Sequence, residues 1–166
     1  NTNYVFDVAG YYSDDLINTN AQYGRFTPMA PKRILDTRDG NGGYRAPVGP
    51  GQSIDVQVAS YLGVPTNDVS AVVLNVTAVR PTAAGHARIW PSDSAMPGAS
   101  SINFSANTNI ANGVTVKLGA DGKVKIYNSS GNTNYVFDVA GYYSAPNGTA
   151  GSRFTSLNPT RILDTC

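Results

Sequence analysis

The residues between positions 36 and 43 have the types and spacing to bind a cation. Asp36, Asp39 and Asn41 lie close together in a stretch that also contains three glycines. Carboxylate and amide oxygens on a flexible loop are ligands that Ca²⁺ accepts, so the stretch suggests a Ca²⁺ site. The spacing lacks the complete ligand set and the terminal Glu of an EF-hand loop. The alternative is a turn in which the Asp side chains bond their own backbone.

The sequence offers little for catalysis. It has one His, His86, and one Cys, Cys166, and no Gly-x-Ser-x-Gly motif that would present a nucleophilic serine. All eleven acidic residues are Asp, and several stand in turn contexts such as Asp121-Gly122. We therefore expect no enzymatic activity.

Aromatic residues suggest a second kind of site. The chain has ten Tyr, five Phe and one Trp, and exposed aromatic rings can stack on sugars. Trp90, which precedes Pro91 at the end of an expected strand, is the best candidate for a carbohydrate-binding platform. The alternative is that Trp90 closes one end of the hydrophobic core.

One pair of charges is expected to be structural. Asp138 lies in an apolar segment, and a buried carboxylate needs a partner. If residues 32–37 lie beside that segment, Arg33 can bond Asp138 with both donors of its guanidinium group. The same pairing would link Asp7 or Asp138 to Arg161. Removing the carboxylate from a buried pair would cost about 3 kcal/mol or more.

These charged residues belong to a sequence that occurs twice. The string N-T-N-Y-V-F-D-V-A-G-Y-Y-S occupies residues 1–13 and again residues 132–144, at an offset of 131 (132 − 1). The motifs R-F-T and R-I-L-D-T, which begin at Arg25 and Arg33, recur at Arg153 and Arg161, at an offset of 128 (153 − 25). Self-similarity of this kind predicts a tandem array.

The two offsets define the expected organisation. Residues 25–144 form one complete repeat. Residues 1–24 are the last strand of a preceding repeat with its linker, and residues 145–166 are a linker with the first strand of the next. Cys166 stands where the first copy has Arg38, so the repeat does not require a thiol there.

Alternating short apolar segments predict the fold class. No stretch has helical periodicity with capping signals, whereas turn-forming residues separate many short β patterns. The sequence therefore predicts an all-β antiparallel β-sandwich of about eight short strands. Residues 70–79 are expected in a central strand, and Asp121-Gly122 is expected to join two strands as a hairpin. The expected strands cover residues 1–12, 32–37, 53–59, 70–79, 87–90, 101–105, 114–118, 123–127 and 132–143.

Composition excludes two classes of partner. The formal net charge is +1 and charged residues make up 14% of the chain, which does not favour nucleic acid. No apolar run approaches the roughly 20 residues of a membrane-spanning helix, so we expect no membrane insertion.

Four motifs together resemble a known family. They are R-I-L-D-T-R at residues 33–38, P-V-G-P-G at 47–51, V-L-N-V-T at 73–77 and V-F-D-V-A-G-Y-Y at 136–143. In this order they resemble a repeat domain of secreted, multidomain surface proteins of actinobacteria. The resemblance implies an extracellular or cell-surface location, tandem copies, and association with secreted enzymes or surface anchors. It implies no catalytic residues.

These observations lead to a functional expectation. The chain is expected to be a non-catalytic structural repeat of an extracellular stalk, fibre or adhesin. At least one terminal strand is expected to find no sheet within the chain, and residues 1–13 or 153–165 would then add head-to-tail to an identical neighbouring unit. The alternative function is a carbohydrate-binding module that attaches secreted enzymes or cells to a polysaccharide.

Overall fold

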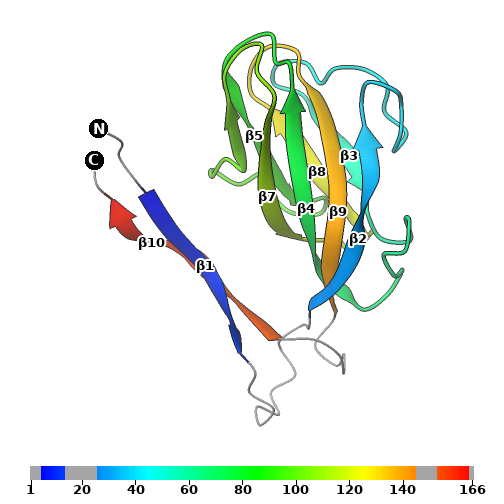
Figure 1. Cartoon of the computed structure of the whole chain (residues 1–166), viewed down its shortest axis with the longest axis vertical. Coiled ribbons are helices and arrows are strands. Elements are labelled where there is room, and N and C mark those ends of the chain that lie inside the picture. The colour runs from blue at the N-terminus through cyan, green and yellow to red at the C-terminus, as the bar shows by residue number, and fades with distance from the viewer. Residues whose placement is uncertain (1–4, 14–25, 145–152, 165–166) are drawn as a thin grey trace.

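The chain contains an antiparallel β-sandwich of two four-stranded sheets, as the sequence predicted. A computed structural model describes residues 5–13, 26–144 and 153–164 (Figure 1). The first sheet has the order β2–β9–β4–β7, with β2 Phe26–Asp36, β9 Asn134–Ser144, β4 Val69–Val79 and β7 Ile110–Lys117. The second has the order β3–β8–β5–β6, with β3 Ser53–Gln57, β8 Lys123–Asn128, β5 Gly85–Pro91 and β6 Ile102–Phe104.

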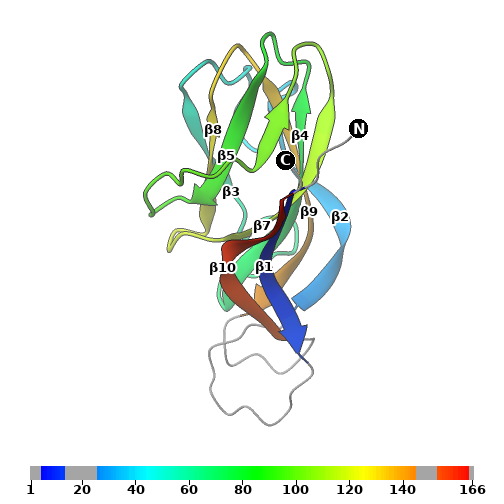
Figure 2. The ribbon, with the colours of Figure 1, turned by 90° about the vertical axis from the view of Figure 1, so that its left-hand side faces the viewer.

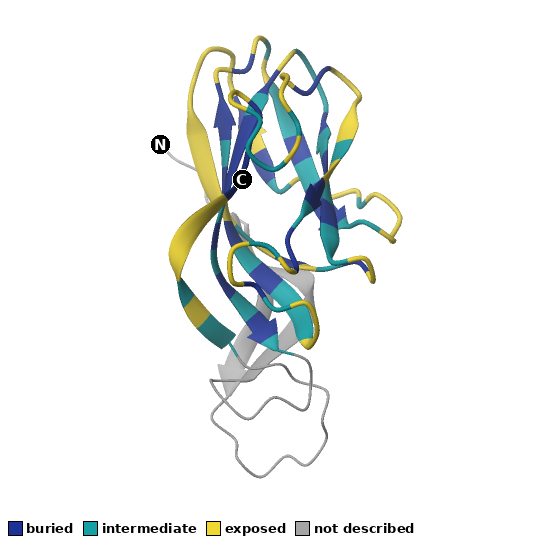
Figure 3. Ribbon diagram, turned by 90° about the vertical axis from the view of Figure 1, so that its right-hand side faces the viewer, coloured by how far each residue is buried: buried dark blue, intermediate teal, exposed yellow. Residues whose placement is uncertain are grey.

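The core lies between the two sheets and follows from the alternation of apolar residues. Val72, Leu74 and Val76 of β4 are buried, and on the facing sheet so are Val124 and Ile126 of β8 (Figure 3). Strand β4 lies between β9 and β7, which confirms the central position expected for residues 70–79. Removing these side chains from water is the main favourable contribution to the stability of such a sandwich.

The hairpin predicted at Asp121-Gly122 is wrong. Strand β7 pairs with β4 in the first sheet, whereas β8 pairs with β3 and β5 in the second. The turn from Gly119 to Gly122 therefore carries the chain from one sheet to the other. Val116 and Val124 both face the core, but from opposite sheets. An alternating pattern is the same in both arrangements, so sequence alone could not distinguish them.

Strand β2 is longer than the sequence suggested, because it begins at Phe26 and not at Lys32. Pro28 and Pro31 argue against a strand in the preceding segment. Proline is nevertheless tolerated in edge strands and bulges, and β2 is the edge of its sheet, with a register shift between Pro28 and Lys32.

The terminal strands form a two-stranded sheet of their own. Strand β1 (Val5–Ser13) pairs antiparallel with β10 (Arg153–Asp164), and neither belongs to a sheet of the sandwich (Figures 1 and 2). This corrects the expectation that a terminal strand finds no partner within the chain. The linkers expected at residues 14–24 and 145–152 lie outside the described residues.

Candidate functional site

The pairing of β2 with β9 joins the first and last strands of the repeat. Phe26, at the start of β2, lies opposite Tyr143, near the end of β9. Asp36, at the other end of β2, lies opposite Val136. Because the two strands are antiparallel neighbours, the chain enters and leaves residues 26–144 at the same end of the sandwich (Figure 1).

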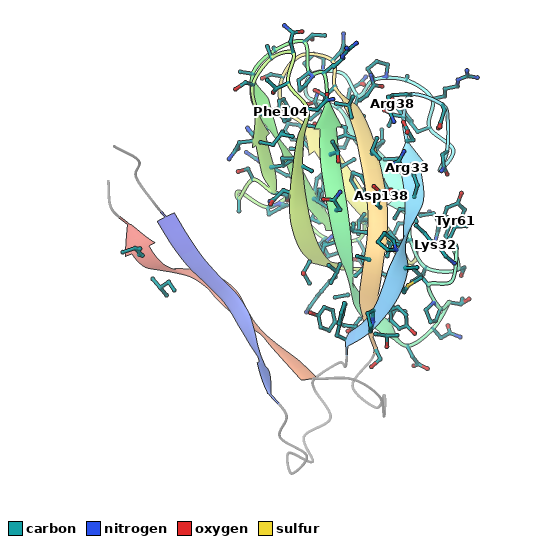
Figure 4. The ribbon with its side chains drawn as sticks, in the orientation of Figure 1. Lys32, Arg33, Arg38, Tyr61, Phe104 and Asp138 are labelled. Carbon is teal, nitrogen blue, oxygen red and sulfur yellow. The ribbon has the colours of Figure 1, made fainter. Side chains whose placement is uncertain are left out.

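Arg33 and Asp138 form the expected pair across these strands (Figure 4). The Arg33 Nε donates to Asp138 Oδ1 at 3.0 Å, and Nη2 lies 3.4 Å from Oδ2. This two-pronged contact raises the pKa of Arg33, chiefly through the hydrogen bond to Asp138. The side chains are, however, 44% and 22% exposed. The expectation of a buried pair costing about 3 kcal/mol is thereby corrected, since exposed pairs contribute about 1 kcal/mol or less.

The buried carboxylate belongs to Asp36, which sequence reasoning had assigned to a cation site. The Arg38 side chain donates to Asp36 through Nε at 2.8 Å and Nη2 at 2.6 Å, and the Arg38 backbone N–H donates at 3.1 Å. Arg33 Nη1 lies 3.4 Å from the same carboxylate. The hydrogen bonds from Arg38 hold the pKa of Asp36 below its usual value.

The side chains of Thr37 and Asn128 form hydrogen bonds to the first two residues of β9, Asn134 and Tyr135. The Thr37 hydroxyl accepts from the Tyr135 backbone N–H at 3.0 Å and donates to Asn134 Oδ1 at 2.9 Å. The Tyr135 hydroxyl donates to Asn128 Oδ1 at 2.9 Å, and burial raises the pKa of this tyrosine. The Thr37 hydroxyl and the Arg38 guanidinium group, at the T-R end of the R-I-L-D-T-R motif, thus both have defined structural partners.

A glycine allows the close approach of the strands where the chain enters and leaves. A Cβ on Gly141 would collide with the Phe26 ring and the carbonyl oxygen of Thr27. Without that atom, Phe26 reaches Tyr143, with ring centroids 5.2 Å apart. This close packing explains why the middle position of the V-A-G-Y-Y segment is a glycine.

The β1–β10 pairing repeats the β2–β9 pairing residue by residue. Strand β1 has the sequence of β9, and β10 corresponds to β2. Each described cross-strand pair of β2 and β9 has its counterpart between β1 and β10 at the two offsets, and the register shifts fall at corresponding places. Asp7 lies opposite Arg161, as Asp138 lies opposite Arg33. The other corresponding pairs are Tyr12↔Phe154 with Tyr143↔Phe26, Tyr11↔Thr155 with Tyr142↔Thr27, Gly10↔Ser156 with Gly141↔Pro28, Val8↔Thr160 with Val139↔Lys32, Phe6↔Leu163 with Phe137↔Leu35, and Val5↔Asp164 with Val136↔Asp36.

The three residues proposed as Ca²⁺ ligands all bond other groups of the protein. The Asp36 carboxylate is neutralised by Arg38 and Arg33. Asp39 Oδ1 accepts from the Asn41 backbone N–H at 2.9 Å, and Asn41 Oδ1 accepts from the Tyr61 hydroxyl at 3.2 Å. Across the described residues, no three His, Cys, Asp or Glu side chains are grouped to hold a metal ion.

Trp90 is not the exposed platform that the sequence suggested. It is only 6% exposed, and its ring Nε1 donates to the carbonyl oxygen of Ser94 at 3.1 Å. This corrects the prediction of sugar stacking at this residue, although it is Ile89, and not Trp90, that packs in the core between the sheets. His86 lies on β5, where its ring is 6.3 Å from that of Tyr127, with no Cys nearby in the described part of the chain.

A pocket of about 390 Å³ lies beside the turn that follows β2. Its polar side chains bond the protein itself, since Gln57 Nε2 donates to the carbonyl oxygen of Ala59 at 2.8 Å and Tyr61 bonds Asn41. The pocket therefore offers few free groups for recognition. The residues lining it are Gly40, Asn41, Gly42, Gly43, Gln57 and Tyr61.

The main feature that sequence reasoning missed is the Arg38–Asp36 bond. Its signal was the spacing R-x-x-D-x-R at residues 33–38, in which both arginines can reach the same carboxylate.

Comparison with known protein families finds no match, and comparison with curated protein sequences finds none either. No helix in the described ranges has the length and hydropathy to cross a membrane.

Proposed function

We propose that this chain is a non-catalytic structural repeat of an extracellular stalk, fibre or adhesin, and that identical units join head-to-tail through their terminal strands. The observation that carries the proposal is the β1–β10 pairing, which has the register of the β2–β9 pairing within the repeat. The resemblance of the four motifs to repeat domains of secreted surface proteins supports the extracellular location.

The assembly follows from the identities of the terminal strands. Strand β1 has the sequence of a repeat's last strand, and β10 resembles a repeat's first strand. The backbone contacts that join them within one chain can equally join β10 of one copy to β1 of the next. Donor and acceptor strands differ, so this contact is heterologous and leaves a free strand at each end of the assembly. Strand addition of this kind draws its affinity from main-chain hydrogen bonds.

The position of the two ends of the repeat, residues 26 and 144, determines how successive units are connected. Each unit is attached to its neighbours at the end where Phe26 meets Tyr143. Successive sandwiches are therefore connected to their linkers at one end only. The opposite end of each sandwich, which contains the Arg38 turn, remains accessible to other molecules. This arrangement suits a surface that displays many copies of one module.

Sedimentation velocity tests the assembly. Pairing within a chain competes at an effective concentration on the order of 1 mM, so protein should be compared between about 0.01 and 1 mM. We expect the mean mass of the full chain to rise with concentration. A chain lacking residues 1–13 should stay monomeric, and so should Val8→Pro, which keeps the length but breaks the ladder of β1. A full chain that stays monomeric throughout, or assembly that survives both changes, would contradict the proposal.

Polysaccharide binding is the alternative function. It would have to use a surface other than Trp90, whose ring is buried. Glycan-array binding by the full chain that is insensitive to loss of residues 1–13 would favour this alternative over assembly.

A further inference from the structure

Strand β9 lies between β2 and β4 in the first sheet, a place here named the β9 position. Its occupant pairs with both neighbours and buries Tyr135, Phe137 and Val139 completely. The same chain carries a second strand with the same sequence, since residues 1–13 and 132–144 are identical. Two identical strands are therefore available for one position.

We propose that β1 is a second occupant of the β9 position, supplied by the same chain. When β1 enters, Phe6, Asp7 and Val8 take the places of Phe137, Asp138 and Val139. The displaced β9 then pairs with β10 in the register that β1 had. Every pairing between named strands is retained in this exchange, because the sequences of the two strands are the same.

The connections are long enough for the exchange. In the β9 position Tyr12 would lie opposite Phe26, and residues 13–25 would link the two ends. An antiparallel connection needs as few as two residues. In the same way, residues 145–152 would connect the displaced Ser144 to Arg153 as a hairpin.

The exchange is confined to this one position. Strand β10 is a poorer substitute for β2, because Asp164 would take the place of Asp36 and Cys166 the place of Arg38, so this buried carboxylate would lack its principal partner. The segment between the R-F-T and R-I-L-D-T motifs also differs, with P-M-A-P-K in β2 and S-L-N-P-T in β10. By contrast, β1 and β9 differ at no position.

The short connection from β8 favours β9 in the resting protein. Thr133 and Val48 exchange two backbone hydrogen bonds, and Asn128 Nδ2 donates to the carbonyl oxygen of Gly131 at 2.7 Å. These contacts hold residues 129–133 where β9 begins. In an array of repeats, β1 would be the last strand of the preceding repeat, so the exchange interlocks neighbouring units. It does not depend on assembly between separate chains.

A set of three substitutions tests the exchange. Phe137→Ala creates a cavity in the core when β9 is the occupant, whereas Phe6→Ala alters only the strand outside the sandwich. We expect each single variant to keep most of the melting temperature of the wild type, because the other strand can fill the position. The double variant has no intact occupant and should melt roughly 10–20 °C lower. Circular dichroism gives the melting temperature and light scattering the mass.

Three outcomes of this experiment distinguish the proposal from its alternatives. Retention of stability by monomeric Phe137→Ala, with loss in the double variant, supports the proposal. If Phe137→Ala melts as low as the double variant, β1 does not enter the β9 position and the proposal fails. If Phe137→Ala is stable only as a dimer, with a melting temperature that rises with concentration, the donor is a second copy and the same-chain assignment is overturned.

Discussion

Arg38→Ala is the substitution whose cost the structure specifies best. Arg38 is 48% exposed, but the Asp36 carboxylate that it bonds is only 2% exposed. The alanine variant loses the side-chain hydrogen bonds at 2.8 and 2.6 Å and leaves Asp36 with the Arg38 backbone N–H and a long contact to Arg33. Removing one partner of a buried ion pair costs about 3–5 kcal/mol. Because Arg38 is half exposed, we place the loss near the lower limit, at about 3 kcal/mol.

Arg33→Ala is the matched control. Arg33 makes a two-pronged bond to Asp138, but both side chains retain contact with water, and the expected loss is about 1 kcal/mol. Urea unfolding followed by the fluorescence of Trp90, the single and buried tryptophan, measures both variants. An equal or smaller cost for Arg38→Ala than for Arg33→Ala would refute the assignment of Asp36 as the critical carboxylate.

The pH dependence gives an independent check of the same bond. The pKa of Asp36 is lowered in the folded protein, chiefly by Arg38. A group with a lowered folded pKa stabilises the fold above its unfolded value, near 3.8, and this contribution is lost as the pH falls through the folded pKa. The difference in unfolding free energy between wild type and Arg38→Ala should therefore narrow below about pH 4.

Two further pairs of substitutions test the turn that follows β2 and the buried amide at the end of β8. Gly42 and Gly43 both have positive φ angles, but a Cβ on Gly42 would collide with the carbonyl oxygen of Ile34, whereas nothing lies within 4 Å of one on Gly43. Gly42→Ala should abolish the cooperative thermal transition or lower it steeply, and Gly43→Ala should cost only about 1 kcal/mol; similar melting temperatures would contradict this. Asn128→Ala removes a fully buried amide that bonds Val48 and Tyr135, and should cost about 3 kcal/mol in urea unfolding, against 1 or less for exposed Asn112→Ala.

The sequence predicted those features that depend on local pattern or on repetition. The high apolar content of residues 70–79 predicted that β4 lies between two neighbours in its sheet. The partnership of Arg33 with Asp138 could be anticipated because both residues stand in segments that recur together.

Features that depend on three-dimensional surroundings could not be predicted in the same way. Residues on both sides of Asp121-Gly122 alternate identically whether they form a hairpin or connect two sheets. Asp138 alternates along β9 with the buried Phe137 and Val139 and so retains contact with water, whereas Asp36 at the end of β2 is buried. Trp90 is buried and its Nε1 donates to the carbonyl oxygen of Ser94, a contact of which the sequence gives no sign.

Cross-strand nuclear Overhauser effects between β1 and β10 test most directly whether the terminal strands are two halves of one repeat interface. The pairs to be measured are Tyr12 with Phe154 and Gly10 with Ser156, alongside their counterparts Tyr143 with Phe26 and Gly141 with Pro28. We predict corresponding contacts in both sets. Contacts of β1 with β10 in a different register, or none, would contradict the account.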